Sequence, residues 1–169
     1  MKLTVNEDGM NKQRGFSLIE LLIVVAIILV IAAIAIPSLL RSRIAANEAS
    51  AAYSLKAVNT AQTTYATAFP QVGFADDLAK LGAPAGGAPF TSNRAGILDF
   101  VLGCATQPCF KSGYDFRIAN TAGSPVASYS AFGTPQVLGK TGTRGFCTDP
   151  SNVITVDVNG STNCTTPLQ

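Results

Sequence analysis

Two groups of residues in this sequence have types and spacings that could support chemistry. One is a set of four cysteines in the last third of the chain: Cys104, Cys109, Cys147 and Cys164. The other is an N-terminal stretch in which Gly15 and Phe16 follow two basic residues and precede Glu20. Histidine, the commonest general base and metal ligand, is absent from the chain. We therefore expect no catalytic residue, no metal site and no cofactor.

The even number of cysteines indicates disulfide bonds formed in an oxidising compartment. Four cysteines allow three pairings. We favour Cys104–Cys109 and Cys147–Cys164, because closure between sequence neighbours is the simplest arrangement. A zinc site is the poorer alternative, since neither spacing is the two-residue knuckle and no histidine can complete the ligand set.

Three further patterns resemble functional motifs but lack their context. Gly139-Lys140-Thr141 matches the end of a phosphate-binding loop, but Thr134 stands where the first glycine is required. The pair Asp76-Asp77 could bind calcium, although two adjacent acids are usually a solvated helix start. Asn159-Gly160-Ser161 and Asn163-Cys164-Thr165 match glycosylation sequons, and the sequence does not decide whether either is used.

The hydrophobic residues, 47% of the chain against only 13% charged, are concentrated near the N-terminus. Residues 21–40 contain no charge, and about 20 apolar helical residues span a bilayer core. Such a block could be a permanent membrane anchor, a cleaved secretory signal or a helix buried in an assembly. Ala33-Ile34-Ala35 fits a signal cleavage site, but the apolar run exceeds the usual signal core and Glu20 has no place in one.

The stretch from Lys12 to Leu22 resembles the processing motif of type IV prepilins and pseudopilins. It has a basic leader, a glycine, an aromatic residue and a glutamate four positions further on. The resemblance is close to about Arg43 and looser beyond. It implies that residues 1–15 are a leader cleaved between Gly15 and Phe16, and that a membrane prepilin peptidase N-methylates Phe16. The chain could start at Met1 or at Met10.

Glu20 is the residue most informative about assembly. A carboxylate near hydrocarbon costs at least about 2.5 kcal/mol on insertion scales and so needs a cationic partner. The new α-amine of Phe16 can supply it, in the same helix or in a neighbouring subunit. In the second arrangement the charge pair fixes the axial register of each newly docked copy. The alternative is a carboxylate that snorkels to the headgroups without a role in assembly.

The apolar block opens a long helix, predicted over residues 16–69. Residues 16–40 would form the transmembrane segment and filament core, with Pro37 causing a kink or a local loss of helicity. Residues 41–69 are amphipathic, with Glu48 filling a gap in the apolar period. The apolar positions of this second half are Ile44, Ala51, Ala52, Leu55, Val58, Tyr65 and Phe69.

Residues 70–169 are predicted to form a globular head, giving an α+β fold with the second half of the helix packed on a small antiparallel sheet. Residues 70–112 are expected to be an irregular connection with a helical turn at 76–81. The sheet, predicted within 113–169, would have three or four strands, the clearest at 114–118, 127–132 and 153–158.

The resemblance implies a structural, non-enzymatic subunit of a type IV pilus-like filament used in adhesion, twitching motility or DNA uptake. Its partners would be copies of itself, the prepilin peptidase, the inner-membrane assembly machinery and, before assembly, the membrane. The precursor would keep its N-terminus in the cytoplasm and export its head, which becomes extracellular in the filament. The scattered net charge of +2 does not decide whether nucleic acid binds. The alternatives are a pseudopilin of a type II secretion system and a monomeric exported protein with an uncleaved anchor.

Overall fold

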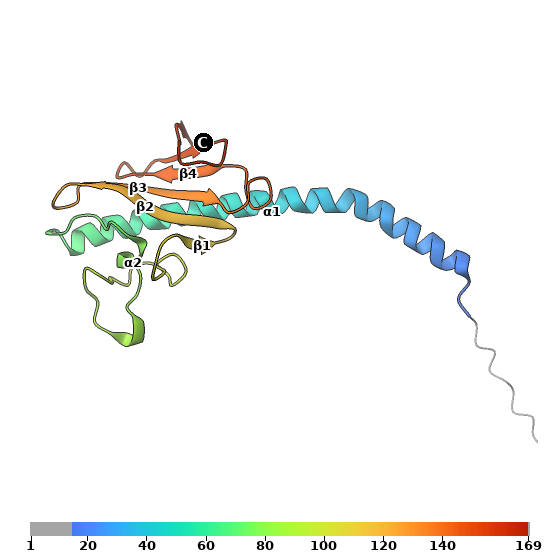
Figure 1. Ribbon diagram of the computed structural model, residues 1–169, viewed down its shortest axis with the longest axis horizontal. Helices are drawn as coiled ribbons and strands as arrows, with labels where there is room; N and C mark the ends of the chain where they lie inside the picture. Colours follow the sequence, from blue (N-terminus) through green and yellow to red (C-terminus); the bar gives the residue numbers. More distant parts are fainter. Residues whose placement is uncertain (1–14, 169) are drawn as a thin grey trace, which may run out of the picture. The chain divides into compact units, whose positions relative to one another are not determined.

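The computed structural model describes residues 15–168 (Figure 1). Contacts divide the chain into a segment that ends at Leu39 and a compact unit that begins at Leu40. Helix α1 (Leu18–Ala68) contributes its first turns to the segment and its remainder to the compact unit. Residues 1–14 of the predicted leader, with both candidate start methionines, lie outside the described residues.

The N-terminal segment is almost entirely helical and makes no core of its own. Of its residues from Leu18 onward, only Ala32 is partly buried, and all the others are exposed. Pro37 lies inside α1, and helical residues continue on both sides of it. The predicted local loss of helicity is therefore not found in the isolated chain. A proline inside a helix removes a single backbone donor, and the neighbouring turns here keep their helical conformation.

In the compact unit, α1 buries one face against the rest of the fold. Its buried apolar side chains recur every three or four residues, as expected for an amphipathic helix. They are Ala51, Leu55, Val58, Ala61 and Tyr65. Four polar residues are buried on the same helix, namely Glu48, Ser54, Asn59 and Gln62.

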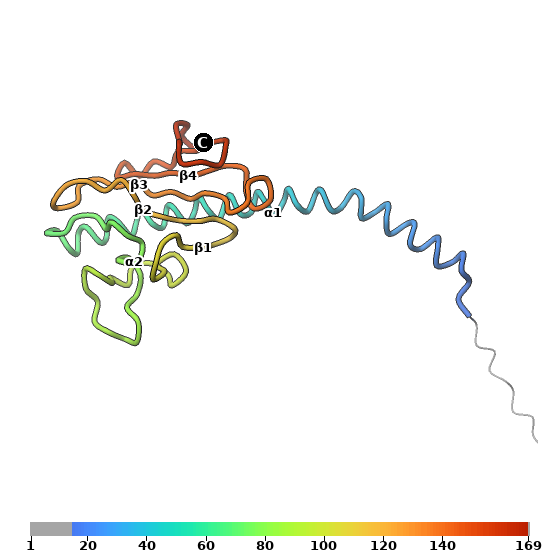
Figure 2. Tube along the Cα trace, in the orientation of Figure 1, coloured from blue at the N-terminus to red at the C-terminus, as the bar shows by residue number. Residues whose placement is uncertain are grey.

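The connection after α1 is held to the helix by side-chain hydrogen bonds. The amide of Gln62 both donates to the carbonyl of Ala75 and accepts from its N–H, each at 2.8 Å. Helix α2 (Leu78–Leu81) follows, with Asp77 as its N-cap. A 3₁₀ turn, η1 (Ala85–Gly87), comes next. Figure 2 shows this connection, green to yellow, on the β1 side of the sheet.

Six strands form one antiparallel sheet in the order β1-β2-β3-β4-β5-β6. Their bounds are β1 (Cys109–Lys111), β2 (Tyr114–Ala122), β3 (Ser128–Pro135), β4 (Gly145–Thr148), β5 (Ile154–Asp157) and β6 (Thr166–Pro167). Both edge strands are short. Next to β1, the amide of Gln107 donates to and accepts from the backbone of Ile118 at 2.9 Å, as a strand neighbour would.

The prediction of three or four strands within 113–169 was too low, and the sheet begins earlier, at Cys109. Strands β2, β3 and β5 lie where the sequence pattern placed them. Strand β4 is buried at all four positions, so it has no polar alternation by which to recognise it. Strands β1 and β6 have only three and two residues, too few for a period to be visible.

One face of the sheet packs on α1 and makes the core. Phe116 pairs with Gly133, and Gly133 pairs with Phe146, so the two buried rings flank a glycine in one row. A Cβ on Gly133 would lie 3.0 Å from the Phe116 ring and 3.6 Å from Leu55 of α1. The missing side chain thus lets the helix and the aromatic rings pack closely against the sheet.

Two disulfides, Cys104–Cys109 and Cys147–Cys164, close loops with sequence separations of 5 and 17 residues. These are the two pairings favoured by proximity in the sequence. The first joins the irregular connection to edge strand β1. The second ties the C-terminal segment to β4, on the sheet face away from α1.

Candidate functional site

The two residues that flank the predicted cleavage position lie just before α1. Gly15 and Phe16 belong to no helix or strand and are exposed, and the Phe16 side chain is 78% accessible to solvent. A side chain at Gly15 would meet no atom within 4 Å. Within the described residues, this peptide is open on all sides, as a protease substrate must be.

The Glu20 side chain caps the first turn of α1. Its Oε2 accepts a hydrogen bond from the backbone N–H of Ser17 at 2.9 Å, while the Ser17 carbonyl accepts from Leu21 N–H at 3.2 Å. Ser17 and Glu20 thus have the spacing and half of the reciprocal bonding of a capping box. The spacing Ser-x-x-Glu is the sequence signal of this capping role, which the charge of Glu20 alone does not indicate.

Glu20 is also the only charged residue from Phe16 to Leu40. The rest of this stretch presents large apolar side chains to solvent, most of them more than half exposed. An 18-residue window of α1 reaches a mean hydropathy of 3.3, with none of it buried, so by length and composition this helix can cross a membrane. Apolar surface of this extent marks a site for lipid or another protein.

Beyond the apolar segment, Glu48 fastens α1 to the loop that leads into β4. The buried carboxylate accepts from the N–H and hydroxyl of Thr143 at 2.8 and 2.7 Å. It also accepts from Nε of Arg144 at 2.8 Å and lies 2.7 Å from Nη2. The Glu48 carboxylate therefore joins the helix to the loop before β4, with both of its oxygens hydrogen-bonded. The sequence signal was a charge at a core position of the helical period, which calls for a buried partner.

These contacts also determine the ionisation of Glu48. Burial alone would raise its pKa, but the hydrogen bonds from Thr143 and the charge and hydrogen bond of Arg144 outweigh burial and lower the pKa below its ordinary value. The carboxylate is consequently charged at neutral pH. The ion pair is a structural connection between α1 and the sheet.

A second buried polar cluster joins α1 to strands β3 and β4. The Asn59 amide donates to the hydroxyl of Thr148 at 2.7 Å and accepts from that of Tyr129 at 3.0 Å. All three residues are buried, and each bond crosses from the helix to the sheet. The cluster fixes the rotation of the helix on the sheet, because a change of helix face would leave these groups unpaired.

The acidic pair considered for calcium has structural partners. Asp77 caps α2 through Ala79 N–H, and Asp76 lies 2.7 Å from Lys80 in an exposed ion pair. Within residues 15–168, no three histidine, cysteine, aspartate or glutamate side chains gather as a metal site requires. The structure therefore brings Ser17 and Glu20 together at the start of α1. In the compact unit it forms two disulfides and two polar clusters that join α1 to the sheet and to the loop before β4.

Comparisons with known proteins bear on the N-terminal part. Residues 10–36 match the family model described as the prokaryotic N-terminal methylation motif. A 54-residue stretch is 48% identical to the type IV major pilin protein PilA of Myxococcus xanthus, covering 32% of this chain. The chain carries the prokaryotic N-terminal methylation motif.

This motif includes Gly15, Phe16, Glu20 and the first part of the exposed apolar helix. The stretch shared with the Myxococcus pilin covers only 24% of that protein's length. No solved structure matches the chain. The α+β architecture, one long N-terminal helix with an antiparallel sheet in the C-terminal part, is pilin-like.

Proposed function

We propose that this chain is a structural subunit of a type IV pilus-like extracellular filament, assembled through α1. The observation that carries the proposal is the exposed apolar helix surface up to Leu40, whose single charged residue, Glu20, lies within the methylation motif. Such a surface can be accommodated in lipid before assembly and against other copies afterwards. The compact unit has its own core and two disulfides, which suits an exported head.

In this proposal a prepilin peptidase cleaves between Gly15 and Phe16 and methylates the new terminus. The precursor sits in the inner membrane with its N-terminus in the cytoplasm, and the assembly machinery moves it into the filament. Glu20 then pairs with the Phe16 amine of a neighbouring copy and sets the register. Pro37 lies in the part of the helix that would adjust on packing.

The deciding experiment is intact-mass and N-terminal analysis of filaments sheared from the cell surface. We expect an abundant chain that begins at N-methylated Phe16 and has the mass of a protein with two disulfides. A processed chain confined to the cell envelope would instead indicate the pseudopilin of a type II secretion system. An unprocessed chain beginning at Met1 or Met10 would refute the proposal and leave a simple membrane anchor.

The use of the filament is a second question, to be answered with a strain that lacks this chain. Twitching on surfaces, attachment to substrates and uptake of labelled DNA are measured separately. Loss of one activity with the others intact assigns the role. Restoration by the wild-type gene is the control.

A further inference from the structure

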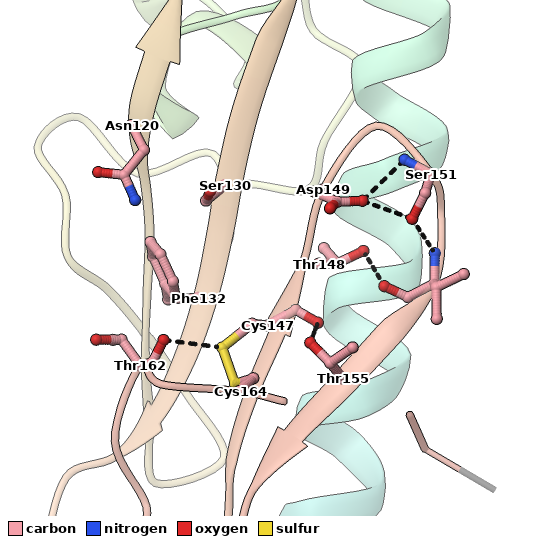
Figure 3. Close-up of a pocket in the computed structure, with 11 residues that line it drawn as sticks. Asn120, Ser130, Phe132, Cys147, Thr148, Asp149, Ser151, Thr155, Thr162 and Cys164 are labelled. Carbon is pink, nitrogen blue, oxygen red and sulfur yellow. Dashed lines mark hydrogen bonds between the residues drawn. A yellow bond between two sulfur atoms is a disulfide. The ribbon is translucent and has the colours of Figure 1, made fainter. Parts of the chain in front are cut away.

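The sheet face away from α1 contains a hollow of about 250 Å³ (Figure 3). The register places Phe132, Cys147 and Thr155 side by side across β3, β4 and β5. Because neighbours along a strand point to opposite faces, this row faces away from the buried Phe146. The Cys147–Cys164 disulfide and Phe132 form the apolar part of the lining, and the turn after β4 forms a polar wall.

An irregularity in β2 turns a polar side chain into this hollow. The β2–β3 register shifts between Ala119 and Ala122, and Asn120 within the shift has φ 53°, in the left-handed region. In an unbroken strand, Asn120 would lie on the core face with Phe116 and Ile118. The bulge instead leaves it exposed among the residues that line the hollow, as labelled in Figure 3. Bulges that re-aim a side chain recur next to functional sites.

Several polar groups of the lining have no hydrogen-bond partner among residues 15–168. Among the described residues, the Asn120 amide, the Ser130 hydroxyl and the Thr162 hydroxyl form no side-chain hydrogen bond. Asp149 uses Oδ1 for the N–H and hydroxyl of Ser151, at 2.9 and 2.6 Å, and leaves Oδ2 unused. The hollow therefore offers both donors and acceptors to a ligand.

The composition of the lining selects a chemical class. Its only charged residue is Asp149, which disfavours anions. Its mixture of hydroxyl, amide and carboxylate groups beside a small apolar wall suits a molecule rich in hydroxyls with C–H faces. The volume lies just under the range of about 300–1,000 Å³ typical of drug-sized ligands, so one small ring fits better than an extended molecule.

We propose that this hollow binds one ring of a neutral saccharide, held by Asn120, Ser130 and Thr162 against the Cys147–Cys164 disulfide. The site goes beyond the filament proposal and does not depend on it, because all its residues belong to the compact unit. Failure of filament assembly would leave this binding intact. Likewise, absence of saccharide binding would leave the filament proposal unaffected.

The test is saturation-transfer NMR on the full chain, solubilised in a detergent without a sugar headgroup. The probes are the methyl glycosides of glucose, galactose and mannose, with glucuronate as the anionic counterpart. We expect at least one neutral glycoside to bind with a dissociation constant of about 1 mM, as for a single weakly held ring. Glucuronate is expected to bind more weakly or not at all.

Two variants and a matched control locate the site. Ser130→Ala removes a hydroxyl, and Asn120→Gly removes the amide while keeping a residue that adopts positive φ. Each is expected to weaken binding about five- to tenfold, the loss of roughly one hydrogen bond. Thr134→Ala removes a hydroxyl from the same strand outside the hollow and should bind like wild type. Absence of transfer to all three neutral glycosides, equal binding of glucuronate, or wild-type binding by both variants would overturn the proposal.

Discussion

Nη2 of Arg144 lies 2.7 Å from Oε2 of Glu48, an ion pair that ties the start of β4 to α1 eight residues after the apolar segment ends at Leu40. Glu48→Gln removes the charge and keeps the size of the side chain. We expect it to lower the free energy of unfolding of the detergent-solubilised chain by about 1–3 kcal/mol at pH 7, because charge-assisted hydrogen bonds are lost. Urea unfolding followed by near-ultraviolet circular dichroism measures the change.

The same pair predicts a pH dependence of known sign. The pKa of Glu48 is lowered in the folded protein, so the stability it contributes is present above its unfolded pKa near 4.5. That stability is lost as the pH falls through the lower, folded value. The difference in unfolding free energy between wild type and Glu48→Gln should therefore shrink below about pH 4.5. A difference that stays constant from pH 7 down to complete acid unfolding would contradict this account.

The two functions assigned to Glu20 can be separated by one pair of variants. Glu20→Gln can still accept the Ser17 N–H, as glutamine does in capping boxes, but it has no charge. Glu20→Ala removes both properties. If the charge sets the register, both variants stay in the membrane and yield few sheared filaments. Immunoblots of the membrane fraction and of the sheared fraction measure this. Normal filament yield from Glu20→Gln together with loss in Glu20→Ala would assign the residue to capping alone.

Tyr129 should ionise late. Its burial and, secondarily, the negative charge of Asp149 raise its pKa to about 12. A raised tyrosine pKa means that stability is present below the unfolded value near 10 and is lost as the pH rises toward 12. Burial also raises the pKa of Tyr65 and Tyr114, so ultraviolet titration of tyrosinate should show a late component that Tyr129→Phe reduces by one tyrosine. Loss of that amplitude near pH 10 rather than near pH 12 would show that Tyr129 does not ionise late.

Tyr129→Phe also tests the buried cluster. It leaves Asn59 Oδ1 without the donor that lies 3.0 Å away in the wild type. We expect a loss of about 1–3 kcal/mol in unfolding free energy at pH 7, the cost of a buried unsatisfied acceptor. Tyr53→Phe is the matched control, since Tyr53 is 74% exposed and should lose almost nothing.

The two disulfides should differ in their contributions. Chain-entropy arguments give about 3 kcal/mol for a loop of the size closed by Cys147–Cys164 and about 2 kcal/mol for the shorter loop of Cys104–Cys109. Paired cysteine-to-alanine variants, unfolded in urea, measure each. A larger loss from the Cys104–Cys109 pair would show that native packing, rather than loop closure, dominates.

The sequence predicted the parts of this molecule that have a strong period or a specific motif. The helix boundaries were within two residues at the start and one at the end, because apolar spacing and Phe69-Pro70 mark them. Strand β4 was missed because Gly145–Thr148 is buried at every position, which gives no alternation. The partners of Glu48 and Asn59 lie about 90 residues away, and no local pattern connects residues at that separation.

The hollow on the outer sheet face was missed for a related reason. Asn120 would be assigned to the core face by simple alternation, and only the bulge reveals that it is turned outward. Ser130 and Thr162 have no distinguishing neighbours in the sequence. A site built from isolated hydroxyl and amide groups on three segments is recognisable only once the strand register is known.

The short edge strands of the sheet matter for the proposed filament, in which the apolar helix would hold copies together. Strand β6 has two residues, one of them a proline without a donor, and β1 has three, beyond which the Gln107 amide occupies the backbone of Ile118. Crowded neighbours thus find few free backbone groups with which to extend a common sheet. In the proposed filament, neighbouring heads would therefore remain separate folded bodies, and the helices would supply the cohesion.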